Sequence, residues 1–422
     1  MRSHKSSPKD ASDSLRNSLR DSLSEKLCEK LPKYSSEGWQ QEGLAKFCVG
    51  EAFFRQSSRT GRDLAVLCAI AHKTHPANPK GTLRVIDAMT GCGVRPLRYA
   101  LEARADTVWA NEGNWELHDS LQSNLSHGLS PERYRITHED ANALFFDCYR
   151  RKDFYDLIDI DCFGSPMPAL STALWAVKLG GLLYLTSTDG RATSGRATDR
   201  GLQTYGAYAR SHPAVHEQGL RLLIGTAVQQ AAAKRLTASP VFSWYHGEVN
   251  RVMVRITREP TWQQQRYGFL GYCHGCGQFQ TVGWKKLGRG LSCACNGADP
   301  PVVSGPMWLG PLHSRLDLAA MQQIAEAQMA KAAAAQSASQ WSECCDLLDM
   351  MSAEAEMPPY FYPLAEIGRR GKMDIPPRAA LIDRLCDRGY KTTRTHIHAQ
   401  AIKTTAPMAV CLEIARQVSR ER

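Results

Sequence analysis

Short apolar runs alternate with segments of helical periodicity between residues 83 and 257. The apolar runs predict strands at 83–87, 107–111, 134–138, 155–160, 182–188, 241–246 and 249–257. Apolar residues spaced three or four apart predict helices at 94–104, 114–126, 167–178 and 219–235. This alternation predicts an α/β fold with a mostly parallel, doubly wound sheet. Only a short turn near Gly247 separates the last two strands, so we expect an antiparallel hairpin at the sheet edge.

The rest of the chain predicts three parts, 1–40, 41–262 and 263–422. In the first, residues 1–12 are Ser- and Lys-rich and favour disorder, and a leucine then recurs every fourth position from Leu15 to Leu31. In the last, residues 316–356 are typical of helix. Residues 373–405 predict a winged-helix-like α+β unit, with a helix between Pro377 and Gly389 followed by a basic hairpin.

The charge of the chain adds a prediction about its partners. Among 422 residues there are 52 Lys and Arg against 42 Asp and Glu, a formal net charge of +10. Such an excess favours nucleic acid, although a merely basic surface is the alternative. No apolar run reaches the roughly 20 residues that span a bilayer, and no signal peptide begins the chain. We therefore expect a soluble, cytoplasmic protein, monomeric and without contact to a membrane, with a bacterial or an organellar protein as the alternatives.

The stretch VIDAMTGCGVRPLRYALE, residues 85–102, joins the first strand of the sheet to a helix through a glycine-rich turn. Asp87 and Ala88 end the strand, and Gly91 and Gly93 follow. Such a turn lets a ligand approach the backbone beside a positive helix N-terminus. In dinucleotide enzymes the acid lies about 20 residues after a G-x-G-x-x-G loop, whereas here it precedes the glycines. This order favours a cationic ligand with hydroxyls, such as S-adenosylmethionine, over an ordinary packing turn.

Acidic residues also follow the second and third strands. Glu112 is placed to accept hydrogen bonds from a ribose diol, and Asp140 with the backbone of Ala141 could bind an adenine amine. Ligands of doubly wound sheets bind outside the carboxyl ends of the strands, where these residues would meet. An acidic surface residue after a strand is the alternative for each one alone.

The fourth strand ends in DLIDIDCFGSP, which supplies the catalytic candidates Asp161 and Phe163. This run resembles the (Asp/Asn)-Pro-Pro-(Tyr/Phe) signature of methyltransferases that act on exocyclic amines. An aryl amine is a poor nucleophile because its lone pair is delocalised into the ring. A carboxylate and the backbone carbonyl of Cys162 can each accept a hydrogen bond from one N–H of the amine, while the aromatic ring stacks on the base. The alternative is a structural Asp-x-Phe-Gly turn.

Two basic segments suggest contacts to RNA. Residues 190–215 are too polar for a core and predict a loop, in which Arg191 and Arg196 suit phosphates and neighbouring tyrosines suit base stacking. Arg62, near the start of a predicted helix, ends a basic stretch that would form a lip over the ligand or over RNA. A flexible loop and a solvated basic edge are the respective alternatives.

A cluster stands out among the 14 cysteines, which otherwise lie mostly in apolar contexts. Cys273 and Cys276 form a CxxC pair, and Cys293 and Cys295 follow with one residue fewer between them. Thiolates at this spacing suit a tetrahedral structural zinc in a zinc knuckle. His274 is a possible substitute ligand, and a redox pair is the alternative.

Several of these motifs together resemble the tRNA (guanine-26-N2)-dimethyltransferases, a family of class I S-adenosylmethionine-dependent methyltransferases. The resemblance runs from about residue 45 to about residue 407 and includes FFRQSSRTGRDLAVL, DAMTGCGVRPLRYALE, DLIDIDCFGSP, the CHGCG…GPMWLGPLHS segment and RGYKTTRTH. It implies a Rossmann-like domain at 41–262 that binds S-adenosylmethionine, and a tRNA-binding domain at 263–422.

The resemblance also implies roles for individual residues. It places Arg62, Asp87, Glu112, Asp140 and Ala141 on S-adenosylmethionine. It makes Asp161 the catalytic carboxylate and Phe163 the ring that stacks on guanine. Three departures are visible. Cys162 replaces a usual proline, which removes rigidity from the loop, and Glu112 replaces a usual aspartate. The second cysteine pair, Cys293 and Cys295, is one residue shorter than usual.

The sequence thus favours dimethylation of the exocyclic amine of guanine 26 in tRNA. Methylation of another RNA amine is one alternative, and a zinc-containing RNA-binding protein with an inactive methyltransferase fold is the other.

Overall fold

The computed structural model describes residues 38–258, 264–289, 291–293, 295, 299–334 and 341–420. Residues Gln41–Arg422 form one compact unit. The leucine stripe at 15–31 and all but the last three residues of the predicted arm lie outside the described residues. Within the described part of the chain, no helix has the length and apolar character needed to cross a membrane.

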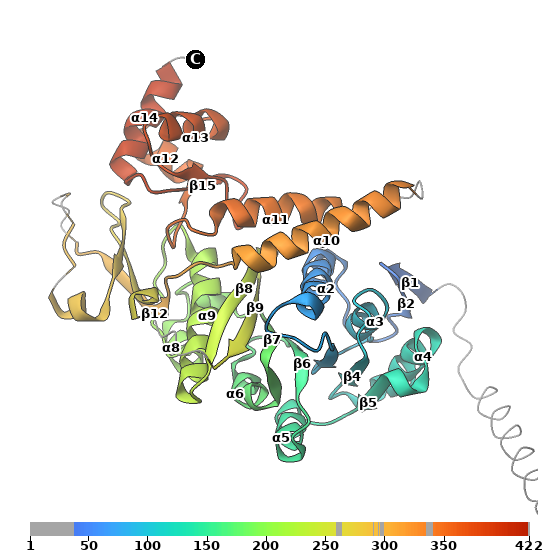
Figure 1. Cartoon of the computed structure of the whole chain (residues 1–422). Helices are drawn as coiled ribbons and strands as arrows, with labels where there is room; N and C mark the ends of the chain where they lie inside the picture. Colours follow the sequence, from blue (N-terminus) through green and yellow to red (C-terminus); the bar gives the residue numbers. More distant parts are fainter. Residues whose placement is uncertain are drawn as a thin grey trace, which may run out of the picture. The chain divides into compact units, whose positions relative to one another are not determined.

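A seven-stranded mixed sheet lies at the centre, in the order β5-β4-β3-β6-β7-β9-β8 (Figure 1). Its parallel strands are β3 (Arg84–Asp87), β4 (Thr107–Asn111), β5 (Tyr134–Thr137), β6 (Tyr155–Asp161) and β7 (Val177–Ser187). The antiparallel pair is β8 (Thr237–His246) and β9 (Val249–Thr257), joined through Gly247 with φ +54°. The predicted doubly wound sheet with an edge hairpin is confirmed. Strand β7 begins five residues earlier than expected and shortens the preceding helix.

Helices cover both faces of this sheet because each strand of its centre is apolar on both sides. One face packs against α2 (Arg59–Thr74), α3 (Val94–Leu101) and α4 (His118–Gly128). The other packs against α5 (Ala141–Arg151), α6 (Met167–Ala176) and α9 (Val215–Ala233). Helix α5 was not among the predicted elements. The Asp140 carboxylate caps it by accepting from the backbone N–H groups of Asn142 and Ala143, at 2.9 and 3.2 Å.

The segment 190–215 differs from the predicted exposed loop. It contains the short helices α7 (Gly190–Thr193) and α8 (Thr198–Tyr205), and several of its small residues are buried. The Tyr205 ring is 4% exposed, and its hydroxyl lies 2.9 Å from the Ser187 hydroxyl at the end of β7. We predicted a loop because most residues of this segment are polar, yet the segment packs against the sheet through alanines and one tyrosine.

Short elements complete the first part of the unit. They are the hairpin β1 (Trp39–Glu42) and β2 (Ala45–Cys48) and the 3-10 helices η2 (Gln56–Ser58), η3 (Trp115–Leu117) and η4 (Pro131–Arg133).

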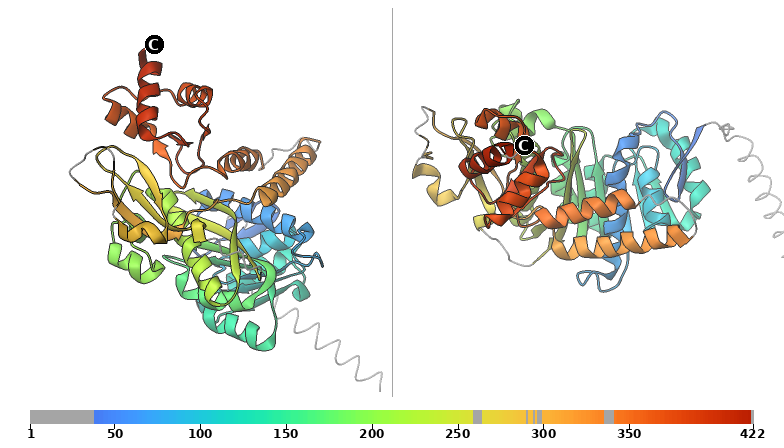
Figure 2. Two further views of the ribbon diagram at one scale, coloured as in Figure 1. Left: turned by 60° about the vertical axis from the view of Figure 1, so that its left-hand side comes forward. Right: turned by 90° about the horizontal axis from the view of Figure 1, so that it is seen from above.

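A three-stranded antiparallel sheet, in the order β11-β10-β12, follows the central one. Its strands and helical turns are β10 (Tyr267–Tyr272), β11 (Phe279–Val282), β12 (Val302–Trp308), η5 (Gln264–Arg266) and η6 (Trp284–Arg289). Two helices then lie side by side, α10 (Arg315–Ala334) and α11 (Ser342–Glu354), as Figures 1 and 2 show. They pack on α2 and share its hydrophobic core, so part of the predicted second domain covers the first. The boundary at 262/263 stays a prediction.

The C-terminal elements form a small α+β unit with a three-stranded antiparallel sheet, β13-β15-β14. They are β13 (Tyr362–Pro363), α12 (Leu364–Gly371), α13 (Arg378–Asp387), β14 (Thr392–Thr393), β15 (Ala401–Thr404) and α14 (Met408–Arg420). Helix α13 follows Pro377, and Gly389 just past its end has φ +84°. Helix α13 followed by the pair β14 and β15 matches the winged-helix-like unit predicted at 373–405.

Buried charges connect this unit to the central fold. The Lys403 ammonium on β15, 1% exposed, lies 2.7 Å from the Glu217 carboxylate on α9 and 3.7 Å from Glu354 at the end of α11. Glu354 is also paired with the imidazole of His396 and lies 3.8 Å from that of His313. Burial raises the pKa of Glu354, but the neighbouring His396 and Lys403 outweigh it and hold the pKa well below its ordinary value.

Candidate active site

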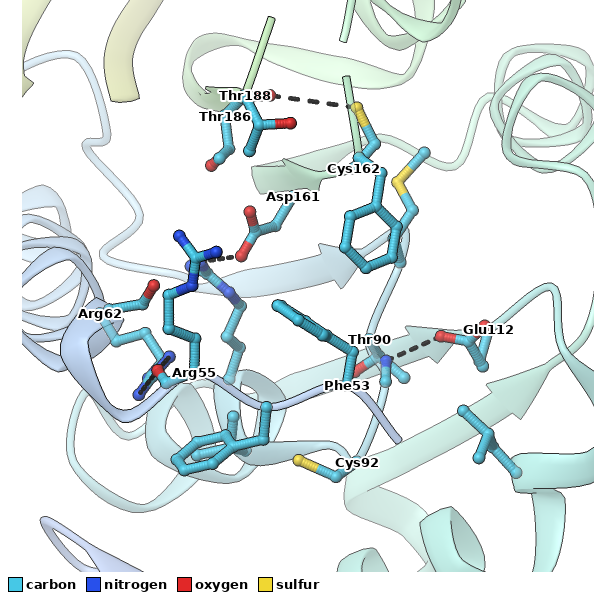
Figure 3. Close-up of a pocket in the computed structure, with 18 of the residues that line it drawn as sticks. Phe53, Arg55, Arg62, Thr90, Cys92, Glu112, Asp161, Cys162, Thr186 and Thr188 are labelled. Atoms are coloured by element: carbon cyan, nitrogen blue, oxygen red, sulfur yellow. Dashed lines mark hydrogen bonds and ion pairs between the residues drawn. The ribbon is translucent and has the colours of Figure 1, made fainter. Parts of the chain in front are cut away.

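A cavity of about 590 Å³ opens at the carboxyl ends of β3, β4, β6 and β7 (Figure 3). Six predicted site residues line it: Arg62, Gly91, Glu112, Asp161, Cys162 and Phe163. The structure therefore brings together residues that lie up to 101 positions apart in the sequence. Their individual roles remain predictions, and the geometry below gives each of them a physical setting.

The glycine-rich turn forms one wall of this cavity. Gly91 has φ +55° and its backbone N–H donates to the Glu112 carboxylate at 2.8 Å, the dashed line beside Glu112 in Figure 3. Gly93 has φ +83° and begins helix α3. A Cβ on Gly93 would lie 2.7 Å from Leu121 on α4, so this turn needs glycine both for its backbone and for space.

Asp87 and Ala88 lie behind that wall and do not line the cavity. The Asp87 side chain is 0% exposed and accepts a hydrogen bond from the Thr90 hydroxyl at 2.9 Å. Burial, followed by the charge of nearby Asp159, raises the pKa of Asp87 well above its ordinary value. In this position Asp87 helps to hold the glycine turn in place, and its contact with a cofactor stays a prediction.

Asp161 projects into the cavity from the end of β6 and is 27% exposed. Its carboxylate is ion-paired with the guanidinium of Arg95 on α3. Burial would raise its pKa, but the charges of Arg95 and then Arg251 outweigh that effect and leave the pKa of Asp161 below its ordinary value. Asp161 is therefore an ionised hydrogen-bond acceptor at neutral pH.

Arg95 is the centre of a buried charge network beneath Asp161. The same guanidinium donates to Asp159 at 3.0 Å, and the Tyr99 hydroxyl donates to that carboxylate at 2.7 Å. Arg95 is 5% exposed and Asp159 0% exposed. A guanidinium shared by two carboxylates fixes the Asp161 side chain in position.

Arg251 on β9 is a second buried arginine in the cavity wall, 3% exposed. Its guanidinium donates to the Ser58 hydroxyl at 3.0 Å and lies over the Trp244 ring at 5.3 Å. Its Nε finds no partner among the described residues. Arg62 also lines the cavity, and its guanidinium is bound by both oxygens of the Glu42 carboxylate at 2.7 and 2.5 Å.

The loop after Asp161 is fixed by hydrogen bonds. The Gly164 N–H donates to the Thr188 hydroxyl at 2.8 Å, and the Gly164 carbonyl accepts from the Thr188 N–H at 2.8 Å. Phe163 is 75% exposed and its ring meets that of Phe53 edge to face at 5.0 Å. These hydrogen bonds join the loop to Thr188 after β7. The loop is therefore held in place although Cys162 replaces the usual proline.

Five other residues predicted to bind cofactor or RNA lie outside the cavity lining, and Gly93 in the turn is one of them. Asp140 is the cap of α5, and Ala141, the first residue of that helix, is buried. Arg191 on α7 and Arg196 after it are exposed. Contacts of these residues with cofactor or RNA stay predictions.

The four cysteines of the predicted zinc site converge. Sulfur atoms of Cys273 and Cys295 are 3.5 Å apart, those of Cys276 and Cys293 are 3.2 Å apart, and all four lie within 4.8 Å of one another. A tetrahedral zinc with Zn–S bonds of about 2.3 Å needs sulfurs at about this spacing. The four sulfurs are sufficient ligands without His274, and their separations are too long for disulfides.

The sequence predictions missed Arg95, Arg251 and Phe53. Arg95 had a signal, since apart from Arg95 and Arg98 helix α3 contains only Val, Pro, Leu, Tyr and Ala, and a helix of that composition is buried. An arginine on such a helix requires a carboxylate partner. Nothing comparable marks Arg251 or Phe53, which reach the cavity only through the fold.

The order of the sheet and the pocket of charged residues at its carboxyl edge define a Rossmann-like methyltransferase. The chain belongs to the N2,N2-dimethylguanosine tRNA methyltransferase family, whose family model matches residues 41–416.

Individual relatives agree with this assignment. A tRNA (guanine(26)-N(2))-dimethyltransferase of Archaeoglobus fulgidus is 30% identical over 381 residues, which cover 89% of this chain and 98% of that protein. The enzyme of the same name from Thermococcus kodakarensis is 28% identical and covers 90% of this chain and 98% of its own length. The solved structure of Pyrococcus horikoshii Trm1 with S-adenosyl-L-methionine superposes with a TM-score of 0.75 and 28% identity, covering 89% of this chain and 99% of that one.

Proposed function

We propose that this protein uses S-adenosylmethionine to methylate the exocyclic amine of guanine 26 in tRNA twice. The observation that carries the proposal is the Asp161 carboxylate, ionised and held by Arg95 in a pocket beside a glycine turn. Membership of the dimethylguanosine family, and the names of its relatives, support this substrate and this cofactor.

The polar groups of the pocket fit S-adenosylmethionine. Glu112 would accept from a ribose diol, the exposed backbone of Gly91 would lie against the amino-acid part, and Arg62 would meet a carboxylate. When bound, the cofactor supplies a methyl group already activated by its sulfonium. The chain itself therefore needs only to position the amine and to stabilise charge.

Asp161 would accept a hydrogen bond from one N–H of the guanine amine, and the Cys162 carbonyl would accept a hydrogen bond from the other N–H. These two bonds draw the nitrogen toward a tetrahedral shape, in which its lone pair is available. The exposed Phe163 ring would stack on the base. The first transfer removes one proton from the amine and leaves one N–H for Asp161. A second transfer therefore requires a second molecule of S-adenosylmethionine and space for the first methyl group.

The target guanine has to leave its stacked position to enter a pocket at a strand edge. Grip on the rest of the tRNA would come from phosphate and shape contacts. We propose the winged-helix-like unit, with Arg191 and Arg196, as one part of that grip, and the division 41–262 and 263–422 as its domain organisation. That the enzyme acts as a monomer in the cytoplasm remains a prediction.

Reconstituted methylation tests the proposal. Purified protein, S-adenosylmethionine and unmodified tRNA should yield dimethylguanosine in nucleoside mass spectrometry. A tRNA with adenine at position 26 is the matched control and should stay unmodified. Methylation of that control, or of ribosomal RNA only, would assign the pocket to another RNA amine.

We also propose that the four cysteines hold a structural zinc. The site has four sulfur ligands and no open position, so the metal would stabilise rather than react. Elemental analysis of the purified protein should find about one zinc per chain. Cys293→Ala should abolish it, whereas Cys386→Ala, which removes an exposed cysteine outside the cluster, should retain it. Zinc equally present in both variants would contradict the assignment.

A further inference from the structure

A second cavity, of about 1000 Å³, lies at the opposite edge of the central sheet. The first residues of β6 and β7 line it, whereas the last residues of the same strands line the cofactor pocket. The two cavities share no residue. Nothing in the proposed reaction uses this second cavity, which we call the amino-edge groove.

Five cations line the amino-edge groove: Lys80, Lys178, Lys234, Arg235 and Arg258. They come from four separate parts of the chain, and the fold gathers them at one edge. Such a concentration of like charge is unfavourable in the free protein unless an anion offsets it.

The groove offers almost no acid to neutralise these cations. Its one acidic residue is Asp156, which is 2% exposed. That carboxylate is already satisfied by the Lys178 ammonium at 2.8 Å and by the Arg84 backbone N–H at 2.8 Å. Within the described part of the chain, no carboxylate lies within ion-pair distance of Lys80, Lys234, Arg235 or Arg258. Four positive charges therefore face the groove without a counter-ion among the residues that the structure describes.

Aromatic rings accompany these charges. Tyr149 is 48% exposed and its ring centre lies 5.1 Å from that of Trp175. The Lys234 ammonium lies over the Trp175 ring at 4.6 Å. Cations interleaved with accessible rings suit a ligand that presents phosphates together with flat bases. An acidic peptide would use the charges but not the rings.

We propose that the amino-edge groove is a second tRNA-contact surface, which binds phosphates and an accessible base of the substrate away from the target guanine. The inference rests on the proposed function, because that function makes tRNA the substrate of this protein. The two sites are separated by the seven residues of β6, roughly 23 Å at 3.3 Å per residue, a span well within one tRNA.

The test compares two variants of the full chain that each lose two positive charges. Arg235→Gln/Arg258→Gln removes two cations of the groove, and Lys46→Gln/Lys331→Gln removes two exposed lysines outside both cavities. All four side chains are exposed, so both variants should fold. Binding of unmodified tRNA is measured at several salt concentrations, together with KM for tRNA and for S-adenosylmethionine.

The groove variant should bind tRNA about tenfold more weakly at about 50 mM salt. Its plot of log affinity against log salt should be shallower by roughly 1.4 to 1.8, since each phosphate contact contributes about 0.7 to 0.9. KM for tRNA should rise in parallel, while KM for S-adenosylmethionine and kcat at saturating tRNA stay unchanged. The control variant should match the unmodified protein.

Equal tRNA affinity and salt slope in the groove and control variants would overturn the proposal. Adenosine monophosphate and inorganic phosphate, titrated by calorimetry with S-adenosylmethionine already bound, test the other source of anions. Binding of either that is lost in the groove variant, without any effect on tRNA, would assign the groove to a small anion and also overturn the proposal. The enzyme could instead methylate another guanine of tRNA while tRNA binding still depends on Arg235 and Arg258. That result would support the groove as a tRNA-contact surface and would show that the assignment to guanine 26 is wrong.

Discussion

The two edges of the central sheet differ in whether their charged side chains are buried and paired. At the carboxyl edge, acids and arginines are buried and paired, as in the bond of Arg95 to Asp159 and Asp161. At the amino edge, cations such as Arg235 and Arg258 are exposed and have no carboxylate partner among the described residues. Buried, paired charges fix atoms in place, which chemistry requires. Exposed charges act over distance and are screened by salt, which suits the capture of a large polyanion.

Removing the carboxylate at the carboxyl edge should have the largest effect. Asp161→Asn keeps the size of the side chain but loses the charge that accepts the amine N–H. We expect kcat to fall by roughly 10³-fold, the range for losing one preorganised electrostatic group. Calorimetry should still find S-adenosylmethionine binding. A variant with near-normal kcat in single-turnover methylation would remove Asp161 from the mechanism.

Removing its buried partner should mainly affect folding. Arg95→Leu leaves Asp159 without a counter-charge in the core, and breaking a buried pair costs about 3–5 kcal/mol. Urea unfolding followed by circular dichroism measures the loss. The double variant Arg95→Leu/Asp159→Leu should recover part of it, because the orphaned charge is gone. A single variant as stable as the parent would show that the network carries little stability.

A smaller effect is expected for the exposed ring at the mouth of the pocket. Phe163→Leu removes base stacking worth about 1–3 kcal/mol, so KM for tRNA should rise at least about fivefold. Since Phe163 is 75% exposed, the urea midpoint should not move. An unchanged KM for tRNA would mean that the ring does not contact the base.

The smallest expected effect is the pH dependence of folding stability that His72 contributes near the amino edge. His72, between the amino-edge groove and α10, has its pKa lowered to about 3, first by burial and then by the charge of Arg255. The unfolded state, with a pKa of about 6.5, therefore binds more protons than the folded state between pH 6.5 and 3. Stability should fall as the pH drops through this window, by at most about 1.4 kcal/mol per pH unit for this one group. His72→Asn should flatten that slope in urea unfolding at pH 4 to 7, and an identical slope would exclude His72 as a source.

Pattern and chemistry predicted the parts of the site that sit at strand ends. Glu112 and Asp161 stand where predicted strands end, and the carboxyl ends of parallel strands converge, so their meeting followed from topology. Arg251 could not be found this way, because an arginine inside an edge hairpin is ordinarily exposed. The segment 190–215 was misjudged for the reverse reason: its polar residues outnumber the few buried ones, Ala192 and Tyr205 among them, that anchor it.

The ion pairs of Lys403 decide how this protein can be divided. Glu217 and Glu354 belong to helices that pack on the central fold, yet Lys403 and His396 reach them from the last 30 residues of the chain. A shortened protein ending before residue 390 would therefore keep Glu354 in its interior while losing both of these partners. Such a truncation should lower expression and solubility even though the whole methyl-transfer pocket is retained. Fragments intended for crystallisation or for domain exchange should accordingly keep the chain through β15, or replace Glu354 along with the segment that is removed.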